Sequence, residues 1–99
     1  MASDRKPIGG AQIRGARALL DIRAEQLAEM SQLGVATIWR AEKGQGVPPI
    51  TKANLQAIRR ALEDAGIEFI DENGHGPGVR FRDRLPPDAP EASHNEASP

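Results

Sequence analysis

The sequence predicts a mainly α-helical domain of four helices followed by a β-hairpin. Between residues 11 and 65, apolar side chains fall on one face of each of four successive helical segments. After residue 66, two short segments alternate apolar and polar residues as strands do, and a loop rich in turn residues separates them. The length of 99 residues suits one small domain and is too short for two.

The first predicted helix spans residues 11–20. Its core-facing side chains recur at helical spacing and are Ile13, Ala16 and Leu20. Residues 1–9, which precede the helix, are polar and include Pro7 and Gly9. We therefore expect a flexible arm before a helical domain that occupies residues 10–66.

Two short helices follow, over residues 24–30 and 35–43, and residues 31–34 between them form a tight turn. The residues expected to face the core are Leu27, Ala28 and Met30 in the first of these helices, and Leu33, Ile38 and Ala41 in the turn and the second helix. Gly44 follows the last predicted helical residue and is a strong signal for the end of a helix.

The fourth predicted helix spans residues 52–65, with Thr51 as its N-cap and Gly66 as its end. Its apolar face consists of Leu55, Ile58 and Leu62. An antiparallel hairpin is predicted over residues 67–82, with strands at 67–70 and 78–82. Residues 83–99 are rich in proline and acidic residues, which predicts a disordered tail.

Two short helices joined by a three- to four-residue turn, packed between two further helices, have the geometry of a helix-turn-helix. The segment AQIRGARALLDIRAEQLAEMSQLGVATIWRAEKG, residues 11–44, resembles the Cro/C1-type (XRE family) helix-turn-helix regulators of bacteria and phages. The residues that carry the resemblance are Arg17, Leu27, Ala28, Ala36, Thr37, Ile38, Glu42 and Gly44. The similarity covers roughly residues 10–66. It implies a lambda-repressor-like fold and a sequence-specific regulator of transcription, most simply a repressor, that binds double-stranded DNA.

The chain departs from the family pattern at two notable positions. Ala24 stands where the family usually has a glutamine that contacts a phosphate, so a phosphate contact must come from another residue such as Arg23. Gln32 stands in the turn where the family commonly has glycine, which favours a left-handed backbone.

The helix over residues 35–43 is the one expected to enter the major groove. The side chains placed on its DNA-facing side are Val35, Ala36, Thr37, Trp39 and Arg40. Arg40 is the candidate for direct base contact, because a guanidinium can bond guanine O6 and N7 together. For Thr37, packing and a phosphate contact remain alternatives. For Trp39, contact with DNA and packing back onto the preceding helix remain alternatives.

Three cations near helix ends are candidates for phosphate contacts, with an ordinary surface charge as the alternative for each: Arg23, Lys43 and Lys52. The resemblance also implies a structural ion pair between Arg17 and Glu42 that braces the first helix against the end of the third.

A dimer on an inverted repeat is expected, since one such domain contacts only a few base pairs. The candidate dimerisation residues are Phe69, Ile70, Val79 and Phe81, because a small helical core offers little surface to cover them, and an edge strand could pair between subunits. The alternative is a hairpin that folds back onto the fourth helix of its own chain.

Composition and charge exclude several other classes of protein. Net charge is −1, but residues 1–66 carry ten Lys and Arg against seven Asp and Glu, and residues 67–99 carry three Arg against seven acids. A basic body with an acidic tail is compatible with a polyanionic partner. With no cysteine and two histidines, we expect no metal site, and the few large apolar residues argue against an enzyme with a substrate cavity.

We also expect no cofactor, no small-molecule effector and no membrane segment or secretory signal, and hence a cytoplasmic protein associated with the nucleoid. Two alternatives to a transcription regulator remain open. One is an antitoxin or anti-regulator whose tail binds a protein partner. The other is a protein-interaction module that does not bind DNA, which the apolar residues of the third helix would suit.

Overall fold

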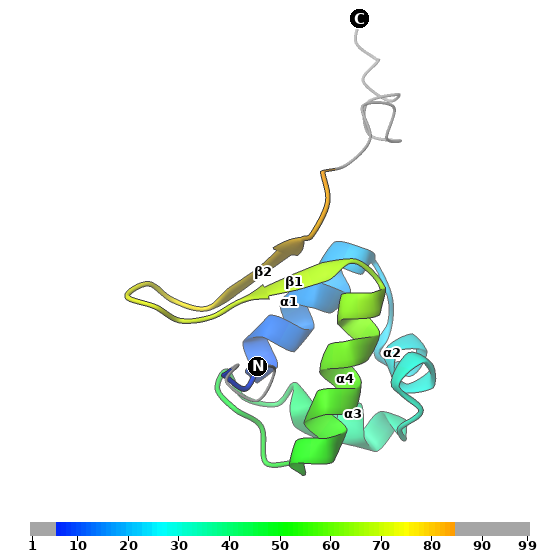
Figure 1. Ribbon diagram of the computed structural model, residues 1–99. Coiled ribbons are helices and arrows are strands. Elements are labelled where there is room, and N and C mark those ends of the chain that lie inside the picture. The colour runs from blue at the N-terminus through cyan, green and yellow to red at the C-terminus, as the bar shows by residue number, and fades with distance from the viewer. Residues whose placement is uncertain (1–5, 85–99) are drawn as a thin grey trace, which may run out of the picture.

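A computed structural model of the protein describes residues 6–84. These residues form four helices and one antiparallel hairpin (Figure 1), and the elements are α1 (Gly10–Leu20), α2 (Ala24–Ser31), α3 (Val35–Ala41), α4 (Lys52–Asp64), β1 (Ile67–Ile70) and β2 (Gly78–Phe81). The mainly helical fold with a hairpin, as predicted from the sequence, is therefore confirmed. No helix in the described part of the chain is both long enough and apolar enough to span a bilayer.

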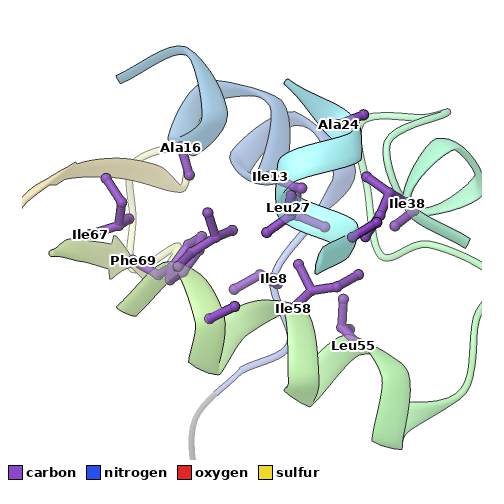
Figure 2. Packing of buried hydrophobic residues seen from close by; sticks show 14 residues of the cluster. Ile8, Ile13, Ala16, Ala24, Leu27, Ile38, Leu55, Ile58, Ile67 and Phe69 are labelled. Atoms are coloured by element: carbon purple, nitrogen blue, oxygen red, sulfur yellow. The ribbon is translucent and has the colours of Figure 1, made fainter. Parts of the chain in front are cut away.

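The helical core is formed by aliphatic side chains that converge from all four helices and β1. Figure 2 shows this packing, and the largest fully buried members are Ile8, Ile13, Leu27, Ile38, Ile58, Leu62 and Ile67. Leu20 and Leu33 are half-buried against this core. Met30, which was expected to face inward, is 41% exposed, so that prediction is wrong. The buried stripe of α2 instead continues to Ser31, whose hydroxyl donates to the carbonyl oxygen of Leu27 at 2.7 Å.

The ends of α4 follow the local signals in the sequence. The Thr51 hydroxyl accepts a hydrogen bond from the backbone N–H of Asn54 at 3.1 Å, which is the N-cap interaction expected of this residue. Gly66, just beyond the helix, has a φ of 107°, a backbone conformation that glycine adopts without a steric penalty.

The third helix is shorter than predicted and ends at Ala41 instead of Lys43. The carbonyl oxygens of Glu42 and Gly44 accept hydrogen bonds from the guanidinium of Arg14 on α1. These contacts tie the segment after Ala41 to α1.

The N-terminal segment is part of the core, contrary to the flexible arm predicted for residues 1–9. Ile8 is only 1% exposed, and the carbonyl oxygen of Lys6 accepts a hydrogen bond from Arg59 at 2.9 Å. The N–H of Gly10 donates to the carbonyl oxygen of Gly46 at 2.9 Å. One isoleucine and a close backbone contact are enough to order this segment. The rest of the predicted arm, residues 1–5, lies outside the described residues.

The hairpin lies against α1 and α4 of its own chain (Figure 1). Its two strands pair Ile67 with Phe81 and Phe69 with Val79, and all four of these side chains are buried or packed against the core. The expectation that the hairpin exposes its apolar residues is therefore wrong for Phe69, Val79 and Phe81. Strand β1 packs on α4, and β2 packs so closely on α1 that a Cβ at Gly15 would lie 3.2 Å from the Val79 side chain.

Ile70 alone among the four candidate dimerisation residues lies on the outer face of the hairpin, where it is half-buried. On the same face Glu68 pairs with Arg80, with 3.3 Å between their charged atoms. Strand β2 ends at Phe81 instead of residue 82. Residues 83 and 84 extend beyond the hairpin without regular structure, and the remainder of the predicted tail, residues 85–99, lies outside the described residues.

Candidate nucleic-acid interface

Helices α2 and α3 are separated by only three residues, 32–34, and α2 packs against both α3 and α4. The turn depends on Gln32, which has a φ of 60° in the left-handed region. The N–H of Leu33 then donates to the carbonyl oxygen of Ala28 at 2.9 Å, which satisfies the end of α2. Glutamine thus adopts the backbone conformation for which glycine would be favoured.

The seven residues of α3 have one buried and one exposed face. Ile38 and Ala41 are completely buried in the core. Ala36, Trp39 and Arg40 are exposed. Because residues three and four positions apart lie on the same side of a helix, these exposed residues form one continuous stripe, which Lys43 extends beyond the helix end. We call these four residues the α3 stripe.

Two of the five residues that were placed on the DNA-facing side lie at its edge. Val35 is half-buried and packs against the core, because it precedes buried Ile38 by three positions and so leans toward the same side of the helix. Thr37 is also half-buried. Its hydroxyl accepts a hydrogen bond from the guanidinium of Arg40 at 3.2 Å, a role that was not anticipated.

Trp39 projects from α3 with 56% of its surface exposed. Of the two alternatives open from the sequence, packing back onto α2 would have buried the indole ring. The structure therefore leaves this large apolar side chain available on the α3 stripe, next to Arg40.

Three further cations were expected near the ends of helices, and all three are exposed: Arg23, Lys43 and Lys52. Arg23 precedes α2 and lies 3.9 Å from the carboxylate of Glu25, an exposed pair that contributes little to stability. Lys43 follows α3, and Lys52 is the first residue of α4. Neither lysine forms an ion pair with any residue in the range 6–84.

The position of α3 depends on two arginines of α1. Arg17 forms a two-pronged ion pair with Glu42 just after α3, with hydrogen bonds of 2.7 and 2.8 Å, so the implied pair is present. Its guanidinium also donates to the carbonyl oxygen of Ile22 at 3.0 Å. The hydrogen bond from Arg17 to Glu42 raises the pKa of Arg17 above its ordinary value, and partial burial of Arg17 opposes that rise.

Arg14 is the second of these arginines, and its role was not predicted. It bonds the carbonyl oxygens of Glu42 and Gly44, which lie on the segment that carries Lys43. The signal was nevertheless in the sequence, because Arg14 and Arg17 are three positions apart and therefore share one face of α1.

Elsewhere in the described residues, no group of three or more His, Asp or Glu side chains could hold a metal ion. A recess of about 130 Å³ lies between the N-terminal segment and the hairpin loop. Gln12 lines it, but its side chain is already bonded to the N–H of Gly9 and to the carbonyl oxygens of Ile70 and Gly78. This recess is smaller than typical ligand pockets.

No family model matches the chain, and no curated protein matches it either. The exposed face of α3 and its surroundings must therefore be interpreted from their own chemistry.

Proposed function

We propose that the protein is a sequence-specific regulator of transcription that binds double-stranded DNA, most simply as a repressor that occupies its site. In this proposal α2 and α3 form a helix-turn-helix, and α3 enters the major groove. The observation that carries the proposal is the α3 stripe, which exposes Trp39 and Arg40 on a short helix whose opposite face is fully buried. The resemblance of residues 11–44 to Cro/C1-type regulators supports the same function.

The dimensions and chemistry of α3 suit the major groove. An α-helix with its side chains is about 10–12 Å across, and the major groove of B-form DNA is about 12 Å wide. Arg40 is exposed and partly oriented by its hydrogen bond to Thr37, so it can present two N–H donors to guanine O6 and N7. The ion pair between Arg17 and Glu42 ties the end of this helix to α1.

Phosphate contacts in this proposal come from Arg23, Lys43 and Lys52, which surround the α2–α3 unit. Three neutralised phosphates per copy give a slope of about −2.7 for the logarithm of the binding constant against the logarithm of salt concentration, and twice that for a dimer. The overall charge of −1 is compatible with such binding, because the acidic residues are concentrated after residue 66.

Two copies on an inverted repeat would supply the specificity that one short helix lacks. The half-sites would be about 34 Å apart, one turn of the duplex. Because Phe69, Val79 and Phe81 pack on their own chain, the surface that joins two copies must lie elsewhere or use only the edge of the hairpin.

The test is selection of binding sequences from a randomised duplex pool at low salt, followed by affinity measurements at several salt concentrations. Trp39 is the only tryptophan in the chain, so its fluorescence reports contact at the α3 stripe directly. An Arg40→Ala variant is expected to lose about five- to 150-fold in affinity for the selected site, which corresponds to about 1–3 kcal/mol. Its folding is checked by circular dichroism.

Arg80→Ala is the matched control, since Arg80 is also an exposed arginine but lies on the hairpin, at the other end of the helical unit from α3 (Figure 1). Its affinity is expected to stay within about two-fold of the unchanged protein. A palindromic selected site supports the dimer, and a single half-site refutes it. If no duplex is enriched at low salt, or if Arg40→Ala binds as well as the unchanged protein, the proposed use of α3 is wrong.

A further inference from the structure

We propose that the α3 stripe recognises the methyl group of a 5-methylpyrimidine, and that Trp39 is the residue that determines this preference. This inference rests on the proposed DNA-binding function and names the base chemistry that α3 selects. The methyl group belongs to thymine or to 5-methylcytosine, and it lies about one or two base pairs from the guanine bonded by Arg40.

The exposed part of α3 carries few hydrogen-bonding groups. Ala36 has none, and Trp39 has a single indole N–H beside a large apolar surface. The hydroxyl of Thr37 already accepts from Arg40. The half-buried Thr37 keeps one O–H donor, Arg40 carries most of the polar groups on this face, and the rest of the exposed surface of α3 is mainly apolar.

The major groove offers an apolar side chain one kind of apolar contact. Base edges there present hydrogen-bond donors and acceptors, and the apolar group among them is the C5-methyl of a pyrimidine. An exposed indole that contacts this methyl removes apolar surface of both partners from water. An unmethylated cytosine or a uracil at the same position offers no such contact.

The spacing on the helix sets the distance between the guanine and the methyl group. Ala36 and Arg40 are four positions apart and Trp39 and Ala36 are three apart, so the Cβ atoms within each pair are about 5–6 Å apart. Base pairs stack at about 3.4 Å, so a methyl that Trp39 contacts beside Ala36 lies about one or two steps from the guanine bonded by Arg40. The small side chain of Ala36 allows α3 to approach the base edge closely.

The residues around Trp39 favour a DNA base edge over an apolar protein surface as its partner. Four large apolar side chains in the described residues are exposed, and they are Leu19, Met30, Trp39 and Val47. Trp39 is the one on α3, where Arg40 lies beside it and Lys43 continues the same stripe. A cationic border around an apolar centre complements a methylated base edge flanked by phosphates better than it complements an apolar protein surface.

The experiment replaces one methyl group at a time in the selected duplex. Each thymine is changed in turn to deoxyuridine, which removes only the C5-methyl, and affinity is measured by Trp39 fluorescence and by anisotropy of labelled DNA. We expect about a four-fold loss at a thymine close to the contacted guanine, the change that corresponds to one buried methyl group. Thymines outside the half-site are expected to show no change.

A second arm distinguishes the two sources of the methyl group. At the sensitive position, cytosine and 5-methylcytosine are compared in otherwise identical duplexes. A gain of about four-fold for 5-methylcytosine shows that the methyl group itself is recognised, whichever base carries it. A methyl effect at thymine alone supports the proposal with thymine as the source.

A Trp39→Ala variant, which changes an exposed side chain and is expected to fold, should bind thymine- and deoxyuridine-containing sites equally. The Arg80→Ala control should retain the full preference.

If the unchanged protein binds a specific site but every deoxyuridine replacement leaves affinity within experimental error, this proposal is wrong while the DNA-binding function stands. If Trp39→Ala keeps the preference, Trp39 is not its source. If no site is selected at all, both proposals fail.

Discussion

Replacement of Arg17 by alanine tests how strongly α1 holds the end of α3. The change removes two hydrogen bonds to Glu42 and one to the Ile22 carbonyl. The Glu42 side chain is only 9% exposed, so its carboxylate would lose its partner without gaining much water. Breaking a buried ion pair costs about 3–5 kcal/mol, and because Arg17 is 24% exposed we expect about 3 kcal/mol.

Replacement of Glu42 by alanine is expected to be milder, at about 2 kcal/mol, because the more exposed Arg17 keeps its bond to Ile22 and gains water. The double variant should be less destabilised than the sum of the two single variants, since neither charge is then left alone. A coupling of about 1–2 kcal/mol is expected.

The assay is urea unfolding followed by circular dichroism, which gives the free energy of unfolding for each variant. A loss of about 3 kcal/mol lowers the melting temperature by roughly 12–24 °C in a domain of this size. If the two single variants each change the free energy of unfolding by less than about 0.5 kcal/mol, or if their effects simply add, the ion pair does not brace α3.

Four further outcomes are expected. Ile8→Ala should destabilise the fold by about 2–4 kcal/mol in the same urea assay, because Ile8 is 1% exposed. If it has no effect, residues 6–9 are a flexible arm as the sequence predicted. Gly10→Ala should lower the melting temperature although alanine has a higher helix propensity than glycine. The new Cβ would collide with the carbonyl oxygen of Gly44 and lie 2.9 Å from the carbonyl oxygen of Ala41, and a rise in melting temperature would contradict this packing. Gln32→Gly should raise the free energy of unfolding by up to about 1 kcal/mol by relieving a φ of 60°, and a loss of stability would show that the glutamine side chain matters more than the backbone. The raised pKa of Arg17 stabilises the folded state at every pH below the pKa of Arg17 in the unfolded chain, and this stability is lost only as pH rises through the folded-state pKa. The loss of unfolding free energy caused by Arg17→Ala should therefore be constant from about pH 6 to about pH 9 in urea titrations, and a change across this range would contradict the reasoning.

Features that depend on neighbouring residues could be predicted from the sequence. Thr51 begins α4 because its hydroxyl reaches an N–H three residues away, and Gly66 follows its end because glycine alone tolerates that φ without penalty. The alternation of the strands and the tight turn after α2 are equally local. For the same reason, helical periodicity identified the exposed residues Ala36, Trp39 and Arg40 of the candidate interface.

Features that depend on distant residues were missed or left open. Arg14 bonds carbonyl groups 28 and 30 positions away, on the segment that follows α3. Ile8 is buried because the segment after α3 returns to meet Gly10, which no pattern within residues 1–9 reveals.

The sequence by itself determined which segments become helices and strands and which residues of α3 face outward, because hydrogen bonds and periodicity within a few residues decide both. Only the tertiary structure decided what the hairpin covers. Phe69 and Val79 face the helices because β1 packs on α4 and β2 packs on α1, where the absence of a side chain at Gly15 leaves room for Val79. That packing gives the apolar strand residues a partner within the chain, whereas the α3 stripe stays exposed and is the surface proposed to contact DNA.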